Sequence, residues 1–263
     1  MKTTVVKLGG HALDATADAV VLLDALADDL LALHDAGDRV ALIHGGGPQI
    51  NELVASMGIE TSFVDGLRVT TEAVLKCVVM GLSYVNANLV AELVRRGVPA
   101  VGLHGASLGL LTCTQRSNTL GAVGLNPVAN AELLLTLMDQ GCVPVIAPYA
   151  SDSEGRLVNC NADAAAGAVA SALKAHALLL LSDIDQVRLD PSDPATAVAE
   201  INGSEARELL ATGAARDGMR PKVESALAAI DHGASRVVIG NGSQPHSVRN
   251  VLARTIPVTE VVA

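Results

Sequence analysis

The stretch Val40–Pro48, VALIHGGGP, decides the fold of this chain. Its apolar run Val40–Ile43 predicts a short buried strand, and a histidine and three glycines (44–47) follow directly. Pro48 suits the first turn of a helix, where its missing N–H is not needed. Glycines between a strand and a helix N-terminus leave amide N–H groups free for an anion, which the helix dipole also favours. The stretch therefore predicts a strand–turn–helix unit with a ligand at its turn.

A second glycine turn follows the first predicted strand, Thr3–Leu8, which contains Lys7 and leads into Gly9-Gly10. One such turn is explained by the positive φ that glycine tolerates, whereas two turns after successive strands indicate a ligand crevice. Neither turn has the G-x-x-x-x-G-K-[ST] pattern of a P-loop or the G-x-G-x-x-G pattern of a Rossmann dehydrogenase. Both of those protein classes are therefore disfavoured.

Short apolar strands and amphipathic helices alternate along the rest of the chain. Further strands are predicted at 100–103, 143–147, 177–181 and 236–239, with a hairpin at 111–114 and 122–125. Helices are predicted at 15–36, 48–57, 71–96, 129–140, 162–174, 204–212 and 219–232. This alternation is typical of a mostly parallel sheet with helices on both faces, built from right-handed βαβ units.

Composition narrows the possible partners. The 263 residues carry a net charge of −10 and only three aromatic side chains, which disfavours binding to nucleic acid by charge and by base stacking. The four cysteines lack metal-ligand spacing, so we expect no protein-held metal site, and scattered thiols fit the reducing cytoplasm. Charged residues interrupt the longest apolar region, 162–181, so no membrane span is predicted.

Polar residues at other element boundaries are further candidates for a site. Arg68, in the motif G-L-R-V-T at 66–70, either binds a carboxylate bidentately or is an ordinary surface arginine. Asn159 and Asn161 offer neutral donors before an alanine-rich helix, although a simple N-cap explains them as well. Lys222 stands in the first turn of a helix, where the dipole disfavours a cation, so either an anion nearby or solvent alone compensates its charge.

The order of these motifs resembles that of the amino acid kinase family, from Lys7 to about Val238. The motifs that carry the resemblance are Lys7-Leu8-Gly9-Gly10, His44-Gly45-Gly46-Gly47, Gly66-Leu67-Arg68-Val69-Thr70, Asn159-x-Asn161-Ala162-Asp163, Ser182-Asp183 and Gly218-Met219-x-Pro221-Lys222. Six motifs in order are far more specific than one glycine loop. Within the family, G-L-R-V-T is similar to the element of the members that phosphorylate N-acetyl-L-glutamate.

The resemblance implies MgATP-dependent phosphorylation of the γ-carboxylate of N-acetyl-L-glutamate, the second step of arginine biosynthesis. It implies a three-layer αβα sandwich around a mainly parallel sheet of about eight strands. Residues 1–175 would form an N-terminal lobe for the acyl-amino acid and dimerisation, and residues 176–263 a C-terminal lobe for ATP. Because a carboxylate is already ionised at pH 7, the reaction needs positioning and charge stabilisation rather than a general base.

The resemblance also implies a role for each matching position. Lys7 and Lys222 match two lysines that stabilise the transferring phosphoryl group, and Asp163 matches the acid that orients them. The positions implied to bind the acyl-amino acid are Gly45, Gly46, Arg68, Asn159 and Asn161. The positions implied to bind the nucleotide are Gly9, Gly10, Ser182, Asp183, Ile184, Asp185, Gln186, Val187, Arg188, Ala214, Ala215 and Arg216.

Three positions depart from the family pattern: Ser107 replaces an acid, Gln186 a glycine, and Pro257-Val258-Thr259 a Gly-Thr pair. We expect all three to lie around the nucleotide or the lobe that holds it. Because the first strand begins near residue 3, we also expect an arginine-insensitive homodimer joined through the N-terminal lobe, with 71–96 as a candidate interface helix. The alternatives are a kinase of another acyl-amino acid, such as N-acetyl-aminoadipate, and a non-catalytic sensor of an amino acid or ATP.

Overall fold

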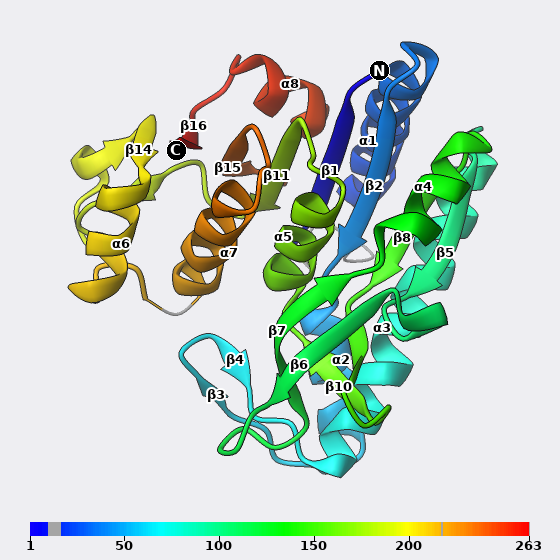
Figure 1. Ribbon diagram of the computed structural model, residues 1–263, viewed down its shortest axis with the longest axis vertical. Helices are drawn as coiled ribbons and strands as arrows, with labels where there is room; N and C mark the ends of the chain where they lie inside the picture. The colour runs from blue at the N-terminus through cyan, green and yellow to red at the C-terminus, as the bar shows by residue number, and fades with distance from the viewer. Residues whose placement is uncertain (10–16, 217, 263) are drawn as a thin grey trace.

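The computed structural model, which describes residues 1–9, 17–216 and 218–262, confirms the three-layer αβα sandwich (Figure 1). Its eight-stranded sheet has the order β14-β16-β15-β11-β1-β2-β8-β5. Neighbouring strands are parallel except β15 and β16, which are antiparallel. The strands are β1 (Thr3–Leu8), β2 (Arg39–His44), β5 (Ala100–His104), β8 (Val143–Ala147), β11 (Ala177–Ser182), β14 (Glu200–Asn202), β15 (Val237–Asn241) and β16 (Val258–Val262).

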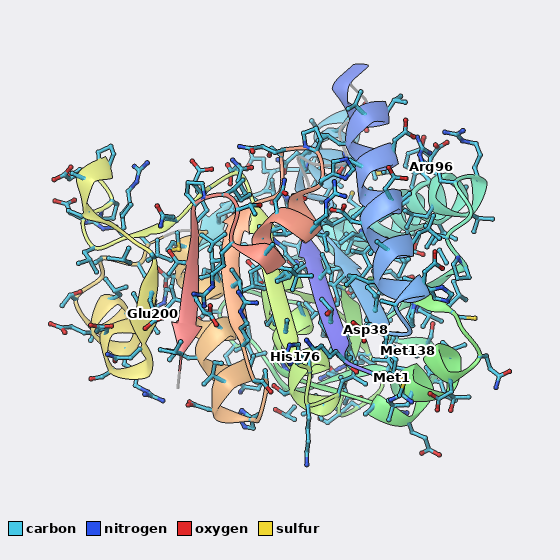
Figure 2. The ribbon with its side chains drawn as sticks, turned by 90° about the horizontal axis from the view of Figure 1, so that it is seen from above. Met1, Asp38, Arg96, Met138, His176 and Glu200 are labelled. Carbon is cyan, nitrogen blue, oxygen red and sulfur yellow. The ribbon has the colours of Figure 1, made fainter. Side chains whose placement is uncertain are left out.

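Helices cover both faces of this sheet, as the view from above shows (Figure 2). Helices α1, α3 and α8 pack over one face, and α4, α5, α6 and α7 over the other. Their bounds are α1 (Ala17–Asp35), α2 (Gly47–Ser56), α3 (Glu72–Arg95), α4 (Ala131–Asp139), α5 (Ala162–Ala172), α6 (Gly203–Ala211), α7 (Met219–Asp231) and α8 (Ser247–Ala253). Helix α2 packs against α3 beyond the end of the sheet.

Two apolar cores result from the alternation of side chains along each strand. On β1, Val5 enters the core with α5 and α7, while its neighbour Val6 enters the core with α1, α3 and α8. On β11, Leu178 likewise enters the first of these cores and Leu179 the second. Since successive residues of a strand point to opposite faces, a strand that is buried on both sides is mostly apolar, and Lys7 is the charged exception on β1.

A small closed barrel and a hairpin adjoin the sheet. The barrel pairs β6 (Leu111–Arg116), β7 (Val123–Ala129), β9 (Tyr149–Asp152) and β10 (Leu157–Cys160). Its β6–β7 pair is the predicted hairpin. The two strands β3 (Phe63–Val64) and β4 (Leu67–Arg68) form a hairpin below α5 and α7 in Figure 1. A third short pair, β12 (Val187–Arg188) and β13 (Ala197–Val198), follows β11.

Every predicted helix and main-sheet strand is present, and most bounds agree within two residues. Residues 15–16 of the first predicted helix lie outside the described residues. At the start of α3, the Thr71 hydroxyl accepts a hydrogen bond from the amide of Val74, so Thr71 is the N-cap of this helix. Gly97, just beyond α3, has φ +89°, a conformation that glycine adopts without strain. Strands β14 and β16 and helix α8 were not predicted.

Helix α3 is long and apolar enough to cross a membrane by composition. In this fold, however, one side of it packs against β5, β8 and α2. Val78, Leu82 and Leu89 are buried there, and Asn86 makes hydrogen bonds within the interior. Buried packing of this kind is that of a core helix.

Candidate active site

The predicted motifs converge where the parallel strands β1, β2 and β11 end. The amide of Gly45 donates to the carbonyl of Leu8 at 2.9 Å, and the amide of Gly9 donates to the carbonyl of Leu181 at 2.9 Å. The three strands therefore continue side by side into their turns. In open α/β sheets, ligands bind in the crevice beyond the carboxyl ends of the strands. Helices α5 and α7 lie side by side and begin at this same end (Figure 1).

A carboxylate between two lysines forms the centre of the site. Lys7 lies on β1, Asp163 in the first turn of α5, and Lys222 in the first turn of α7. The two carboxylate oxygens of Asp163 contact the Nζ atoms of Lys7 at 2.9 Å and Lys222 at 3.1 Å. All three residues are more than nine-tenths buried. Asp163 is therefore the anion that compensates the charge of Lys222.

The same contacts set the protonation states of this centre. Burial lowers the pKa of Lys7, and the positive charge of Lys222 lowers it further, while Asp163 acts in the opposite sense. Burial by itself would raise the pKa of Asp163, but the two ammonium groups hold that pKa below its usual value. Asp163 is therefore an ionised carboxylate that holds two lysines of like charge side by side.

Two of the positions predicted to bind the nucleotide, Gly9 and Ser182, lie where β1 and β11 end. A Cβ atom on Gly9 would lie 3.3 Å from the Cα of Ser182, so the turn after β1 passes close to the end of β11. The Ser182 hydroxyl is buried and has no hydrogen-bond partner among the described residues. A buried hydroxyl without a partner fits a ligand oxygen, such as that of a phosphate. Gly10 lies outside the described residues.

The remaining positions predicted to bind the nucleotide lie in two segments, 183–188 and 214–216. Asp183, Asp185 and Arg188 are exposed on the loop after β11, where Asp185 accepts a hydrogen bond from Asn241. Ile184, Val187, Ala214 and Ala215 contribute to one apolar core. The pKa of Asp190 is lowered mainly by hydrogen bonds from Ser192 and, to a smaller extent, by the positive charge of the exposed Arg216, which therefore lies nearby. The structure thus brings 214–216 near the loop that follows β11. Among the described residues, no group of three His, Cys, Asp or Glu could hold a metal.

Two of the three family departures contact each other. The Gln186 amide donates to the carbonyl of Val258 at 3.0 Å, and the hydroxyl of Thr259 accepts from the amide of Val187 at 2.9 Å. The glutamine thus ties the loop after β11 to β16. The expectation for Ser107 was wrong: this residue follows β5, the strand at the opposite edge of the sheet from β14, and contacts His104 at 3.1 Å.

Arg68 is a buried arginine. Its guanidinium contacts the Asn51 side-chain oxygen at 2.7 Å and lies over the Phe63 ring, 4.6 Å from its centre. Burial lowers its pKa from the ordinary value for arginine. Since an arginine stays charged in proteins and this one has only neutral hydrogen-bond partners among the described residues, its charge is free to bind a carboxylate.

The two predicted asparagines differ in what they contact. The Asn159 side chain donates to the Thr70 hydroxyl at 3.0 Å, which in turn donates to the carbonyl of Arg68. Asn161 is an N-cap, because its side-chain oxygen accepts from the amides of Asp163 and Ala164. The cap thus places Asp163 at the start of α5. Asn51 and Thr70 were not predicted as site residues, because only their tertiary contacts with Arg68 and Asn159 reveal them.

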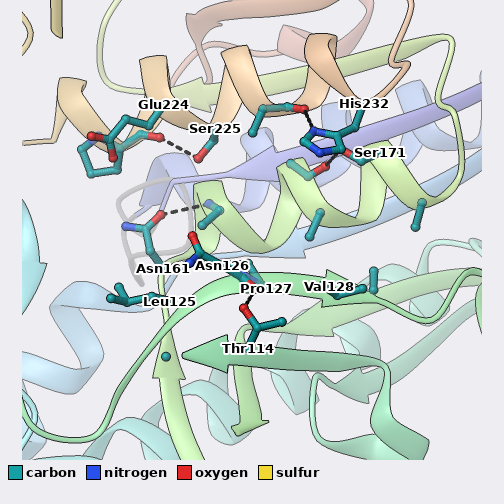
Figure 3. A pocket seen from close by; sticks show the side chains of 18 of the residues that line it. Thr114, Leu125, Asn126, Pro127, Val128, Asn161, Ser171, Glu224, Ser225 and His232 are labelled. Atoms are coloured by element: carbon teal, nitrogen blue, oxygen red, sulfur yellow. Dashed lines mark hydrogen bonds between the residues drawn. The ribbon is translucent and has the colours of Figure 1, made fainter. Parts of the chain in front are cut away.

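A groove of about 670 Å³ extends from the Asn161 end of the site along α5, between α7 and β7 (Figure 3). Small residues of α5 form its floor, including Ala164, Gly167 and Ala168. The hydroxyl groups of Ser171 and Ser225 donate to carbonyls of their own helices. The groove therefore offers a mainly apolar surface. Of the predicted site residues, Asn161 alone lines it.

Comparisons with known proteins agree with this geometry. Residues 2–241 match the pattern of the amino acid kinase family. An acetylglutamate kinase of Symbiobacterium thermophilum is 39% identical over 94% of this chain and 86% of its own length. One from Methanopyrus kandleri is 40% identical over 90% of this chain and 94% of its own. The structure of N-acetylglutamate synthase from Neisseria gonorrhoeae, with coenzyme A and N-acetyl-glutamate, has a TM-score of 0.80 at 26% identity, and this chain spans 59% of it.

The family match and the relatives identify the class of this protein as a phosphotransferase. The chain belongs to the amino acid kinase family. Its relatives at about 40% identity are acetylglutamate kinases, so it is a kinase that uses ATP together with a divalent metal ion.

Proposed function

We propose that this chain transfers the γ-phosphoryl group of MgATP to the γ-carboxylate of N-acetyl-L-glutamate, within arginine biosynthesis. The observation that carries the proposal is the buried Lys7–Asp163–Lys222 centre at the ends of β1, α5 and α7. Phosphoryl transfer spreads negative charge over the oxygens of the transferred group, so two adjacent ammonium groups stabilise its transition state. The relatives' names supply the acceptor.

Each part of the site has a role in this reaction. Lys7 and Lys222 bind the transferring phosphoryl group, and Asp163 holds them together. Arg68 binds a carboxylate of the acceptor, with Asn159 beside it and the amide of Gly46 on the facing turn. The amide of Gly45 is already paired with the carbonyl of Leu8, so Gly45 contributes to this turn through its backbone shape. Asn161 acts mainly through the cap that orients Asp163. Mg²⁺ enters with the phosphates, because it prefers phosphate and water ligands and the described residues offer no metal cage.

The nucleotide lies over the lobe formed by residues 176–263. Ser182 and Gly9, which adjoin each other where β11 and β1 end, contact the phosphates of the nucleotide, together with Gly10. The exposed loop 183–188 and the neighbouring segment 214–216 surround the rest of the nucleotide. The lobe of residues 1–175 holds the acyl-amino acid. The division at 175/176 falls between α5 and β11.

Lysine variants test this assignment of roles. Lys222→Met removes one charge at the transferring group, so kcat should fall roughly a hundredfold, which corresponds to about 3 kcal/mol. Lys7→Met should lower kcat by a similar factor. Arg220→Met, a control in the same turn with a half-exposed side chain paired to Glu224, should keep kcat within about threefold. Unchanged kcat in both Lys7 and Lys222 variants would contradict the proposed centre.

A kinase of N-acetyl-aminoadipate remains the second candidate for the acceptor. One methylene in a pocket changes binding by about 1–3 kcal/mol, and the groove beside Asn161 leaves room beyond the acceptor. A non-catalytic sensor is less well supported. Such a protein gains nothing from holding two buried lysines against one aspartate, because a buried charge is costly.

A cytoplasmic homodimer is part of the proposal. Helix α3 exposes Met80 and Tyr84 one turn apart, and Val94 further along. It lies beside β5, the uncovered edge strand of the sheet. An apolar helix face beside an open strand edge is suited to pairing with a second copy. Light scattering should give twice the chain mass, and Tyr84→Asp should give the monomer; a monomeric wild-type protein would contradict this. The described free cysteines suit the cytoplasm.

A further inference from the structure

A buried histidine stands directly beneath the glycine turn of β2. His44 is completely buried at the end of this strand. Its Nδ1 lies 2.8 Å from the carbonyl oxygen of Gly45, and its Nε2 lies 3.0 Å from Nδ2 of Asn86 on α3. The same Nδ2 of Asn86 donates to the carbonyl of Val145 at 3.0 Å. Neither nitrogen of the His44 ring faces the crevice as a free group.

These contacts permit one arrangement of protons. A carbonyl only accepts hydrogen bonds, so Val145 fixes the Asn86 amide with its nitrogen as the donor. Asn86 then donates its second hydrogen to Nε2 of His44, which must accept. The proton of the neutral ring is therefore on Nδ1, where it is donated to the carbonyl of Gly45. Burial lowers the pKa of His44 to about 4, against the smaller effect of the Gly45 contact, so the ring is neutral at pH 7.

The held carbonyl determines where the next amide points. The described residues contain no cis peptide bond, and in a planar trans peptide the C=O and the following N–H point in opposite directions. Because His44 holds the carbonyl of Gly45 toward the interior, the N–H of Gly46 points away from it. That N–H has no acceptor among the described residues and stands at the N-terminus of α2. Such an amide is suited to an anionic oxygen.

We propose that His44, held by Asn86, is a positioning residue that aims the amide of Gly46 at a carboxylate oxygen of the acceptor. The inference rests on the proposed function, which places the acceptor at the 45–46 turn. His44 itself contacts neither the acceptor nor the phosphates. Asn86 links this turn to α3, and its side chain fits only because residue 102 is glycine: a Cβ there would lie 2.5 Å from the Asn86 side-chain oxygen.

Two amide substitutions separate positioning from packing. Asparagine places its NH₂ near the position of Nδ1, so His44→Asn keeps the donor to Gly45 and loses the contact with Asn86. Glutamine reaches the position of Nε2, so His44→Gln keeps the contact with Asn86 and loses the donor. The proposal predicts that His44→Gln raises KM for N-acetyl-L-glutamate roughly tenfold to a hundredfold, the effect of one hydrogen bond to a charged group. His44→Asn should raise it less than about threefold.

The readouts distinguish this role from general damage. In both variants KM for MgATP and kcat at saturating acceptor should stay near the wild-type values, and thermal unfolding should show a folded protein. Equal acceptor KM in the two variants, or a larger rise in His44→Asn, would overturn the positioning role. Arg68→Lys reports on the acceptor site itself. If Arg68→Lys leaves acceptor KM unchanged, the proposed acceptor site is wrong; if it raises KM while His44→Gln does not, only the role of His44 fails.

Discussion

The substitution Asp163→Asn gives the sharpest test of the lysine–aspartate centre. Asparagine keeps the shape of the side chain but removes the charge that contacts Lys7 at 2.9 Å and Lys222 at 3.1 Å. Two buried ammonium groups then face each other without an anion. Removal of one partner from a buried ion pair costs about 3–5 kcal/mol, because the remaining charge is uncompensated. For a chain of this size that corresponds to a fall in Tm of roughly 6–20 °C.

Urea unfolding and calorimetry, each with and without MgATP, measure this effect. The phosphates of the nucleotide replace the lost anion, so MgATP should raise the Tm of Asp163→Asn more than that of the wild type. Adding Lys7→Met to the variant removes one of the two facing cations and should restore about 1–2 kcal/mol. Asp231→Asn is the matched control, because its pair with Arg207 is half-exposed and contributes at most about 1 kcal/mol.

Two results would refute this reasoning. If Asp163→Asn unfolds at the same urea concentration as the Asp231→Asn control, the buried centre does not depend on the carboxylate. If the double variant with Lys7→Met is no more stable than Asp163→Asn alone, the two lysines do not repel each other across the site.

Three further predictions follow from single contacts. Ser182→Ala should weaken ATP binding roughly fivefold in calorimetric titration without lowering the Tm of the free enzyme, since its hydroxyl has no partner in the described chain; unchanged affinity would contradict its phosphate role. Arg68→Lys should raise KM for N-acetyl-L-glutamate roughly tenfold to a hundredfold in steady-state assays and leave KM for MgATP unchanged, because lysine cannot bind a carboxylate bidentately. The pKa of His44 is about 6.5 in the unfolded chain and about 4 in the folded chain, so between these two pH values only the unfolded chain binds a proton there. As the pH falls through this window, His44 should therefore lower the free energy of unfolding, measured by urea titration, by about 1.4 kcal/mol per pH unit. His44→Asn should flatten that slope, and an equal slope in both proteins would contradict the burial of a neutral ring.

Local patterns made much of the fold predictable. The strands 3–8 and 143–147 are found with the predicted bounds, because each contains a short run of buried β-branched and aliphatic residues. Strand β14 was missed because it has only three residues, Glu200–Asn202, at the edge of the sheet. Strand β16 was missed because Thr259 and Glu260 interrupt its apolar run. Their pairing depends on partners far away in the sequence, which a local pattern does not contain.

The site was predictable up to the identity of its tertiary partners. The position of Lys222 in a helical first turn suggested an anion nearby, with solvent as the alternative, and the structure shows Asp163 there. The order of strands within the sheet was not predictable from their order in the chain, and for this reason Ser107 was expected on the wrong side. The same limit hid Asn86, which reaches His44 across 42 positions of sequence.

Trapping of the acyl phosphate as its hydroxamate tests the central claim most directly. The wild-type protein, MgATP and hydroxylamine are incubated with N-acetyl-L-glutamate, N-acetyl-aminoadipate, aspartate or glutamate, with Lys7→Met as the blank. The account predicts strong hydroxamate formation with N-acetyl-L-glutamate that disappears in the Lys7 variant. No hydroxamate from any acceptor, while ATP still binds, would contradict it and indicate a sensor rather than a kinase.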